Sequence, residues 1–445
     1  MSNNSINIRE IITEILLSID KGEEHSHILL KNVLDKYDYL PQNDKNFIKR
    51  VTEGTLENRI RIDYVINAYS KTPVNKMKPL IRNLVRMSIY QIIYMDKVPD
   101  SAVCNEAVKL AGKRGFRGLS GFVNGLLRNI SREKESIKWP PKDSDNPGDI
   151  AVLFSSPLLI VKSLIDDYGV EETKRSLEYS LGISRMYVRL DERLDAEQKE
   201  AVFSEWDENG ITYRQHDEIP YAYFLEGADN PAKLTGFAKG DYMMQDLSSM
   251  YVCELAGIAA GDTVVDVCAA PGGKSMHAAI KLSIAEKDAE QVPKGRVISR
   301  DVSEYKVDFI NDNASRLHID NIVTEVWDAT VLDEELIGKA DVVIADVPCS
   351  GIGVIGRKPD IKYNLTEEGL HSITVLQKQI IDNAVRYVKP GGTLMFSTCT
   401  MRKAENDENV DYILTSGEFG LEEKRQFFIT DEHDGFFIAK LIRNK

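Results

Sequence analysis

The chain has 445 residues, 42% of them hydrophobic and 28% charged, which is an ordinary globular balance and long enough for two or three domains. Its five cysteines are odd in number and include no CxxC pair, which argues against a disulfide framework and a metal site and favours a reducing cytoplasm. Residues 1–5 carry no basic charge and no apolar run could cross a bilayer, so we expect neither a signal peptide nor a membrane span.

The net charge of −14 is unevenly distributed along the chain. Residues 1–140 carry a formal charge of +7 and residues 141–445 carry −21, so the N-terminal third is the part that an RNA or DNA backbone would meet. A solvated face without a nucleic-acid partner is the alternative explanation. The basic side chains form two groups: Lys71, Lys76, Lys78, Arg82 and Arg86, and then Lys113, Arg114, Arg117, Arg128 and Arg132.

Residues 1–143 are predicted to form a helical bundle. Apolar side chains recur at the i, i+3, i+4, i+7 spacing of an amphipathic helix over residues 8–19, and similar spacing continues to about residue 133 without valine-rich strand patterns. The Pro/Asp/Gly-containing stretch 139–148 is typical of an exposed linker. We therefore place a domain boundary near residue 143.

Residues 144–238 are predicted to form a small α+β domain. A helix start at Ser155-Ser-Pro157 precedes a strand at 186–190 and a polar helix from Ala196 to about Glu208, which Gly210 ends before another strand. The acidic character of this region makes it a poor non-specific RNA binder by itself.

From about residue 240, strands alternate with helices. This alternation predicts a doubly wound, mostly parallel sheet. The predicted strands are 263–267, 297–299, 322–326, 342–345, 393–396 and 436–442, with helices from Lys274 and near 376–388.

Two cysteines stand where predicted strands end. Cys349 closes Asp346-Val-Pro-Cys349 and Cys399 lies in Ser397-Thr-Cys-Thr400. Because ligands bind at the carboxyl ends of parallel strands, both thiols are expected to face one crevice. There one thiol could add to an electron-poor carbon while a second group removes a proton. Two buried small apolar side chains are the alternative.

A glycine-containing loop, residues 266–275, follows one strand and opens a helix, where free backbone N–H groups can meet a ligand. Its end, Gly273-Lys-Ser275, resembles a phosphate-binding P-loop. A P-loop, however, requires glycine at the position of Cys268, and G-x-G-x-x-G is also absent. The loop therefore disfavours a nucleoside triphosphatase.

Three acidic residues follow successive strands. Asp301 occupies the position where adenosine-binding sheets place a carboxylate for the ribose hydroxyls. Asp328 is suited to hold an adenine edge or, alternatively, to cap the next helix. Asp346 could contact the exocyclic amine or a ring nitrogen of a base, and a structural ion pair would give the same pattern.

Four segments match one family as a set: Gly240-Asp-Tyr-Met-Met-Gln-Asp-Leu-Ser-Ser249, 266–274, 346–353 and 397–400. Through them residues 236–445 resemble the RNA cytosine-C5 methyltransferases of the Nol1/Nop2/Sun family. The helical N-terminus, including 122–128, resembles the NusB-type RNA-binding fold. The resemblance implies a multidomain protein. Its parts are an all-α NusB-like RNA-binding domain at 1–143, a small α+β (RRM-like) RNA-binding or linker domain at 144–238, and a Rossmann-like class I methyltransferase domain at 239–445.

The resemblance also implies roles for the reactive residues. Cytosine C5 is a weak nucleophile, so a thiolate must add at C6 before C5 can attack a sulfonium methyl group. Cys399 is implied as this nucleophile. Asp346 would promote the addition at N3, and Cys349, or a water molecule as an alternative base, would remove the C5 proton so that Cys399 can leave. Val347 and Thr400 stand where the family usually has alanine and serine, and neither change removes a reactive group.

The implied methyl donor is S-adenosylmethionine. Lys274 would bind its carboxylate or, as we favour, organise the loop through a salt bridge to Asp266 or Asp346. The residues expected to bind the donor are Cys268, Ala269, Ala270, Pro271, Gly272, Gly273, Lys274, Asp301, Asp328 and Asp346.

The predicted function is methylation of C5 of a cytosine in 16S rRNA by a cytoplasmic, monomeric enzyme without an obligate protein partner. Two alternatives stay open: an RNA-binding antitermination or ribosome-assembly factor, and a tRNA cytosine-C5 methyltransferase. Two reactive cysteines and a complete cofactor loop are unnecessary in a binding module, which favours the first prediction.

Overall fold

The computed structural model describes residues 7–22, 25–181, 186–228, 230–287, 289 and 293–445. The chain forms two compact units, one of Met1–Gly182 with Ile355–Leu365 and the other of Ile183–Val354 with Thr366–Lys445. The three-part division at residues 143 and 238 stays a prediction. Residues 1–5, on which the expectation about a signal peptide rests, lie outside the described residues.

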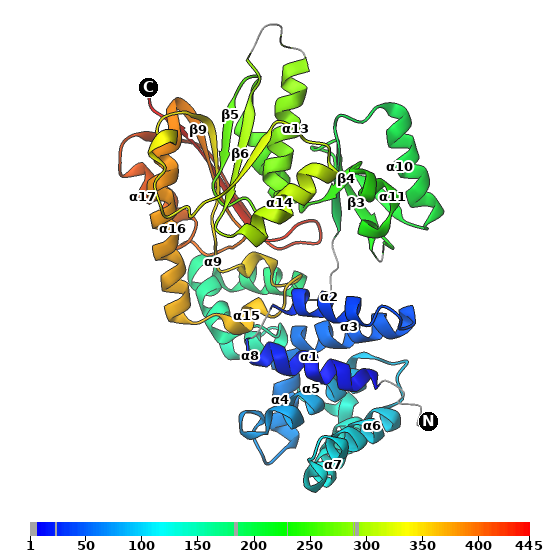
Figure 1. The fold of residues 1–445 in the computed structure, drawn as a ribbon. Helices are drawn as coiled ribbons and strands as arrows, with labels where there is room; N and C mark the ends of the chain where they lie inside the picture. Colours follow the sequence, from blue (N-terminus) through cyan, green and yellow to red (C-terminus); the bar gives the residue numbers. More distant parts are fainter. Residues whose placement is uncertain (1–6, 23–24, 182–185, 229, 288, 290–292) are drawn as a thin grey trace. The chain divides into compact units, whose positions relative to one another are not determined.

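The first unit is helical and buries one apolar core (Figure 1). In α1 (Ile8–Asp20) the buried side chains recur at the predicted spacing, and the Asn7 side chain caps the helix by accepting from the Glu10 N–H at 3.2 Å. The longer helix α5 (Pro79–Tyr94) is buried along most of its length and is central to the core. The other α-helices are α2 (Ser26–Lys36), α3 (Gln42–Glu57), α4 (Arg59–Tyr69), α6 (Asp100–Lys113), α7 (Ser120–Glu133), α8 (Pro147–Leu153), α9 (Leu158–Tyr179) and α15 (Ile361–Asn364).

The helix predicted to start after Pro157 is α9, which is kinked at Gly169, where φ is 80°. No single helix within the described ranges is both long and apolar enough to cross a membrane. Only α8 and α9 taken together, across a bend of 116°, reach the required length and composition.

The segment Ile355–Leu365, which follows the Cys349 motif in sequence, packs in the helical unit. The buried Asp360 carboxylate accepts hydrogen bonds from the Ser26 backbone N–H, at 3.0 Å, and from the Ser26 hydroxyl. Lys362, also buried, donates to the Glu57 carbonyl at 3.0 Å. Burial lowers the pKa of Lys362 to about 7.

The second unit contains a seven-stranded sheet with the order β10-β11-β9-β8-β5-β6-β7. The strands from β5 to β9 pair in parallel, and β11 is antiparallel to both of its neighbours, which confirms the predicted doubly wound, mostly parallel sheet. The edge strand β10 is missing from the prediction because only Phe419 in it is buried and a run of four charged residues interrupts its apolar pattern. The bounds are β5 (Thr263–Asp266), β6 (Arg296–Asp301), β7 (Ile322–Val326), β8 (Ala340–Asp346), β9 (Val388–Thr398), β10 (Phe419–Phe427) and β11 (Phe436–Arg443).

Helices cover both faces of this sheet, as α13 and α16 show in Figure 1. Along β8, Val342 and Ile344 pack in the core with α12, α13 and α14, whereas Val343 and Ala345 pack with α16 and α17. Burial on both faces explains why this strand reads as a continuous apolar run. The helices are α12 (Leu247–Ala256), α13 (Gly273–Lys287), α14 (Glu304–Arg316), α16 (Glu367–Tyr387) and α17 (Asp407–Leu414).

The same unit contains a four-stranded antiparallel sheet with the order β2-β3-β1-β4. Its βαββαβ element order is that of a split βαβ fold, whereas the small domain with bounds 144–238 stays a prediction. A capping box between Asp195 and Gln198 starts its first helix. The bounds are β1 (Tyr187–Leu190), α10 (Ala196–Glu208), β2 (Thr212–Gln215), β3 (Ala222–Glu226), α11 (Thr235–Lys239) and β4 (Tyr242–Met244).

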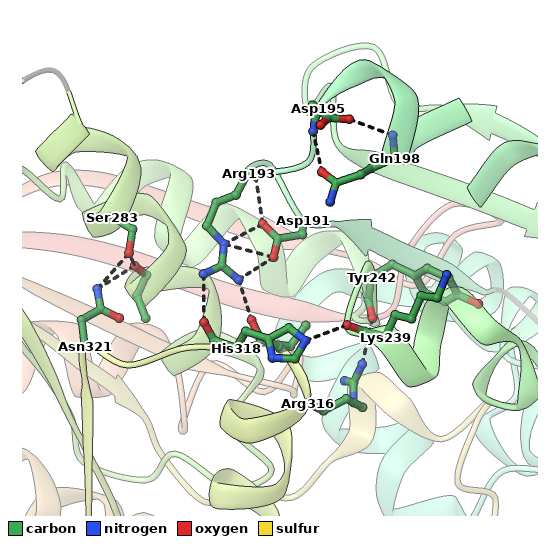
Figure 2. A network of polar contacts seen from close by, with 12 residues as sticks. Asp191, Arg193, Asp195, Gln198, Lys239, Tyr242, Ser283, Arg316, His318 and Asn321 are labelled. Carbon is green, nitrogen blue, oxygen red and sulfur yellow. Dashed lines mark hydrogen bonds and ion pairs between the residues drawn. The ribbon is translucent and has the colours of Figure 1, made fainter. Parts of the chain in front are cut away.

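Figure 2 shows a network of hydrogen bonds and ion pairs that connects this small sheet with the turn after α14. Arg193 lies 2.6 Å from the Asp191 carboxylate and donates to the carbonyls of Leu317, at 2.6 Å, and His318, at 3.3 Å. From the other side, Arg316 donates to the Tyr242 carbonyl at 3.1 Å. These bonds join the small sheet to the seven-stranded sheet within the second unit.

Candidate active site

The candidate active site lies at the carboxyl ends of the central strands. β5 pairs with β6 on one side and β8 on the other, and open α/β sheets bind ligands at such a switch point. In the β8–β9 register Asp346 lies opposite Ser397, whose hydroxyl donates to the Asp346 carboxylate at 2.8 Å. Because Cys349 and Cys399 follow these two residues closely, the strand register brings their loops together.

The structure places Cys349 and Cys399 in contact, with their sulfur atoms 3.1 Å apart. Both are free thiols and both are partly exposed, unlike the buried Cys104 and Cys253. The hydrogen bond to Cys399, together with burial, raises the pKa of the Cys349 thiol. Two adjacent thiols do not ionise independently, so the contact with Cys399 favours the protonated form of Cys349.

Lys274 extends from the glycine loop toward the cysteines. Its Nζ lies 2.7 Å from Asp346 Oδ2 and 5.2 Å from the ring centre of Phe436. Burial acts to lower the pKa of Lys274, but the Asp346 carboxylate outweighs it, so this pKa is raised and the ammonium stays charged. Of the two carboxylates expected to pair with Lys274, Asp346 does so, which supports a role in organising the loop.

The glycine loop lies beside Asp301. That carboxylate accepts from the backbone N–H groups of Ala270, at 3.0 Å, and Val302, at 2.8 Å, and pairs with Lys306 at 3.0 Å. Since a carboxylate has about four acceptor positions, it can still receive a ribose hydroxyl. The loop also ends at the start of α13, whose first-turn N–H groups lack partners within the helix. This donor and acceptor set fits S-adenosylmethionine.

Asp266 and Cys268 lie at the start of the glycine loop. Ser275 Oγ donates to Asp266 at 2.6 Å, and burial raises the pKa of Asp266 to about 7 although the Ser275 bond acts to lower it. Burial, followed by the carboxylates of Asp266 and Asp301, raises the pKa of the Cys268 thiol well above its ordinary value. Cys268 is therefore a poor nucleophile that suits a loop-forming role.

Asp328 lies apart from the cysteines, exposed beyond the end of β7. Its Oδ1 accepts from the Thr330 N–H at 2.9 Å and the Thr330 hydroxyl at 2.7 Å, and these bonds lower the pKa of Asp328. Such bonds stabilise a turn, as the capping alternative expects. A contact with adenine stays a prediction.

Sequence reasoning missed a set of buried polar residues behind the cysteines. Gln377 on α16 and the consecutive Glu405 and Asn406 are fully buried and bond to both cysteine loops. Glu405 and Asn406 belong to the polar run 402–409, which resembles a solvent-exposed loop in sequence. The helical spacing of Asn409 with apolar residues on α17 is the one signal that could have indicated burial.

Four of the ten basic residues expected to meet a nucleic acid take part in ion pairs inside the helical unit. Their charge is therefore partly compensated, and the basic surface is narrower than the sequence count indicates. The pairs are Arg82 with Asp20, Arg86 with Asp63, and Lys113 and Arg114 with Glu10.

The fold and the site together define a class: a seven-stranded sheet with antiparallel β11, a glycine loop after β5 and a carboxylate at the end of β6 characterise a class I S-adenosylmethionine-dependent methyltransferase. The family model of the 16S rRNA methyltransferase RsmB/F matches residues 255–442, and that of the NusB family matches residues 6–132. The chain belongs to the ribosomal RNA small subunit methyltransferase B family.

Two relatives carry this assignment over nearly the whole chain. The probable ribosomal RNA small subunit methyltransferase B of Bacillus subtilis (strain 168) is 33% identical, with 98% of each chain covered. The ribosomal RNA small subunit methyltransferase B of Proteus mirabilis (strain HI4320) is 27% identical, with 99% of each chain covered. The predicted family, its enzymatic class and its methyl donor are thereby confirmed.

Solved structures show the same fold. The crystal structure of PH0851 has a TM-score of 0.79 at 22% identity and covers 99% of each chain. NSun6 from Pyrococcus horikoshii, solved with SFG, has a TM-score of 0.55 at 20% identity, over 64% of this chain and 97% of that chain. These likenesses confirm the helical N-terminal domain with a Rossmann-like methyltransferase domain.

Proposed function

We propose that this methyltransferase modifies C5 of one cytosine in 16S rRNA through a covalent bond between Cys399 and cytosine C6. The observation that carries the proposal is the 3.1 Å contact of Cys349 and Cys399 beside the Lys274–Asp346 pair. The reaction needs an addition at one carbon and a proton removal at the adjacent carbon. Two thiols in contact can act on adjacent atoms of one ring.

In the first step the Cys399 thiolate adds to C6 and makes C5 electron-rich. Asp346, held by Ser397 and Lys274, faces the base from the neighbouring strand end; it can accept from the exocyclic amine, and with Lys274 it can provide a hydrogen bond or proton to N3. S-Adenosylmethionine, when bound by the glycine loop and Asp301, supplies the electrophilic methyl group.

In the second step, once C5 carries the methyl group, Cys349 acts as the base that removes the C5 proton and so releases Cys399. Formation of the C6–S bond removes the hydrogen bond with Cys399 and the charge of Cys399, two of the causes that raise the pKa of the Cys349 thiol. Cys349 can then lose its proton to solvent and take the C5 proton. The electrons of the broken C5–H bond re-form the C5–C6 double bond, and the C6–S bond breaks to return Cys399 as a thiolate.

The names of the relatives and of the matching family model support 16S rRNA as the substrate. Both basic groups lie within residues 1–143, so we assign contact with the RNA backbone to this NusB-like segment and leave the RRM-like residues 144–238 as an RNA-binding or linker domain. We further propose that the enzyme works in the cytoplasm, as a monomer and without an obligate protein partner.

The test of this function is methylation of RNA from a strain that lacks the gene. Cys399→Ala removes the nucleophile, so kcat is expected to fall by at least roughly 10³-fold while binding of S-adenosylmethionine, measured by calorimetry, is unchanged. Cys104→Ala, a buried cysteine of the helical unit, is the matched control and keeps its activity. Normal methylation by Cys399→Ala would contradict the assigned nucleophile, and methyl label confined to size-separated tRNA would contradict the substrate.

A further inference from the structure

Two consecutive buried residues, Glu405 and Asn406, lie behind the two cysteine loops. Asn406 bonds on both sides of Cys399: its Oδ1 accepts from the Thr398 hydroxyl at 2.5 Å and its Nδ2 donates to the Thr400 carbonyl at 3.1 Å. Asn406 thus bridges the residues that flank the nucleophile.

The Cys349 loop is held in the same manner. Glu405 Oε2 accepts from the Ser350 N–H at 2.7 Å, and Gln377 Nε2 donates to the Pro348 carbonyl at 2.9 Å. Asn409 Nδ2 donates to Gln377 Oε1 at 2.8 Å and so fixes which end of that amide faces Pro348. Pro348 is therefore held from α16, and Ser350 is held from the loop that precedes α17.

We infer that Gln377, Glu405, Asn406 and Asn409 form a cysteine clamp, a set of positioning residues that fixes the separation of the two thiols for successive addition and release. The inference rests on the proposed function. Gln377, Glu405 and Asn406 are fully buried, and a buried polar group is costly unless it is hydrogen bonded, so their bonds to the cysteine loops restrict where the loops can lie. Within the clamp, Asn406 positions Cys399 for the addition to C6. Gln377 and Glu405 position Cys349 for removal of the C5 proton.

A thiol cross-linking experiment tests the clamp without RNA or methyl donor. The azo oxidant diamide accepts two electrons and two protons from the paired thiols, so that the Cys349–Cys399 disulfide forms and diamide becomes its hydrazine. Because the reaction needs the two sulfur atoms in contact, Asn406→Ala and Gln377→Ala are expected to cross-link about tenfold more slowly than the wild type. Intact mass and peptide mapping measure the product.

The matched control is Asn383→Ala. Asn383 is also a buried asparagine on α16, but it donates to the Ala329 carbonyl at 2.9 Å and does not contact the cysteine loops. Its cross-linking rate is expected to equal that of the wild type. If Asn406→Ala and Gln377→Ala cross-link at the wild-type rate, as Asn383→Ala is expected to do, the clamp is wrong, whatever the thermal stability of the variants.

A second readout separates the two halves of the clamp. With RNA and methyl donor, Gln377→Ala is expected to accumulate a denaturant-resistant protein–RNA adduct as Cys349→Ala does, whereas Asn406→Ala forms less adduct than either. If Cys349→Ala gives an adduct and Gln377→Ala behaves as Asn383→Ala, the clamp is wrong and the proposed function stands. If Cys349→Ala gives none while the cross-linking differences are present, the proposed chemistry is wrong and the clamp geometry stands.

If an alanine variant does not fold, conservative variants test the clamp instead. Asn406→Asp keeps the acceptor for the Thr398 hydroxyl but loses the donor to Thr400, and Gln377→Glu loses the donor to Pro348. Both are expected to cross-link more slowly than the wild type, by less than the alanine variants. Wild-type rates in both would overturn the clamp.

Discussion

At the scale of single residues, Gly353 determines how closely the Cys349 motif approaches the Cys399 loop. Its N–H donates to the Cys399 carbonyl at 3.1 Å, and its carbonyl accepts from the Gly435 N–H at 2.9 Å. A Cβ added at Gly353 would lie 1.9 Å from the Gly435 oxygen and 2.8 Å from the Cys399 oxygen. Both neighbours are backbone atoms, so a side chain here must displace one of the loops.

Gly353→Ala is therefore expected to lower kcat by roughly 10²-fold, because a displacement of about 1 Å misaligns the reacting groups. Steady-state methylation assays measure this, with the KM for RNA less affected than kcat. Gly420→Ala, on the edge strand β10 where an added Cβ meets nothing within 4 Å, is the control. Wild-type kcat in Gly353→Ala would show that the loops tolerate the shift.

The residues that carry reactive groups could be predicted because each follows an apolar strand. Cys349, Cys399 and Asp346 were predicted in that way, and the structure brings them together at the neighbouring carboxyl ends of β8 and β9. Glu405 and Asn406 could not be found, since only the tertiary fold buries a run of polar side chains. The difference is physical: strand ends are marked by local pattern, whereas burial of a polar loop depends on distant helices.

At the scale of elements, all the parallel strands of the large sheet were predicted, but the accuracy of their bounds does not follow their burial. β7 matches its predicted bounds, whereas α16 starts at Glu367 instead of near Leu376 because its first turns are partly exposed and give a weaker apolar pattern. The anchoring of Ile355–Leu365 in the helical unit could not be predicted either. A charged residue, Lys362, is buried there, which no hydropathy pattern indicates.

Lys362 makes the stability of this segment dependent on pH. Its folded pKa of about 7 is below the ordinary value of 10.5, so between these values the unfolded chain binds the extra proton and stability rises with pH. Lys362→Met removes the titration. The difference in unfolding free energy between wild type and variant is expected to change from pH 7 to pH 9 by up to about 1.4 kcal/mol per pH unit, in favour of the wild type at high pH. Urea denaturation at several pH values measures it, and a pH-independent difference would contradict the burial of an uncharged lysine.

At the scale of the whole molecule, charge and chemistry are divided along the chain. The sequence places +7 in residues 1–140 and the reactive cysteines in the acidic remainder, so the proposed RNA contact and the proposed chemistry lie in different segments. The exposed stretch at 139–148 indicated a linker, but α8 and α9 beyond it are part of the helical unit. Linker composition shows where a chain is exposed, and not with which core the following helices pack.

The central claim, a covalent cytosine adduct on Cys399, is tested most directly by trapping it. Cys349→Ala is mixed with S-adenosylmethionine and RNA from a strain lacking the gene, on which the wild-type enzyme is first shown to be active. The account predicts a denaturant-resistant protein–RNA adduct that maps to one cytosine of 16S rRNA and disappears when Cys399 is also changed to alanine. No adduct, or one that persists without Cys399, would contradict it.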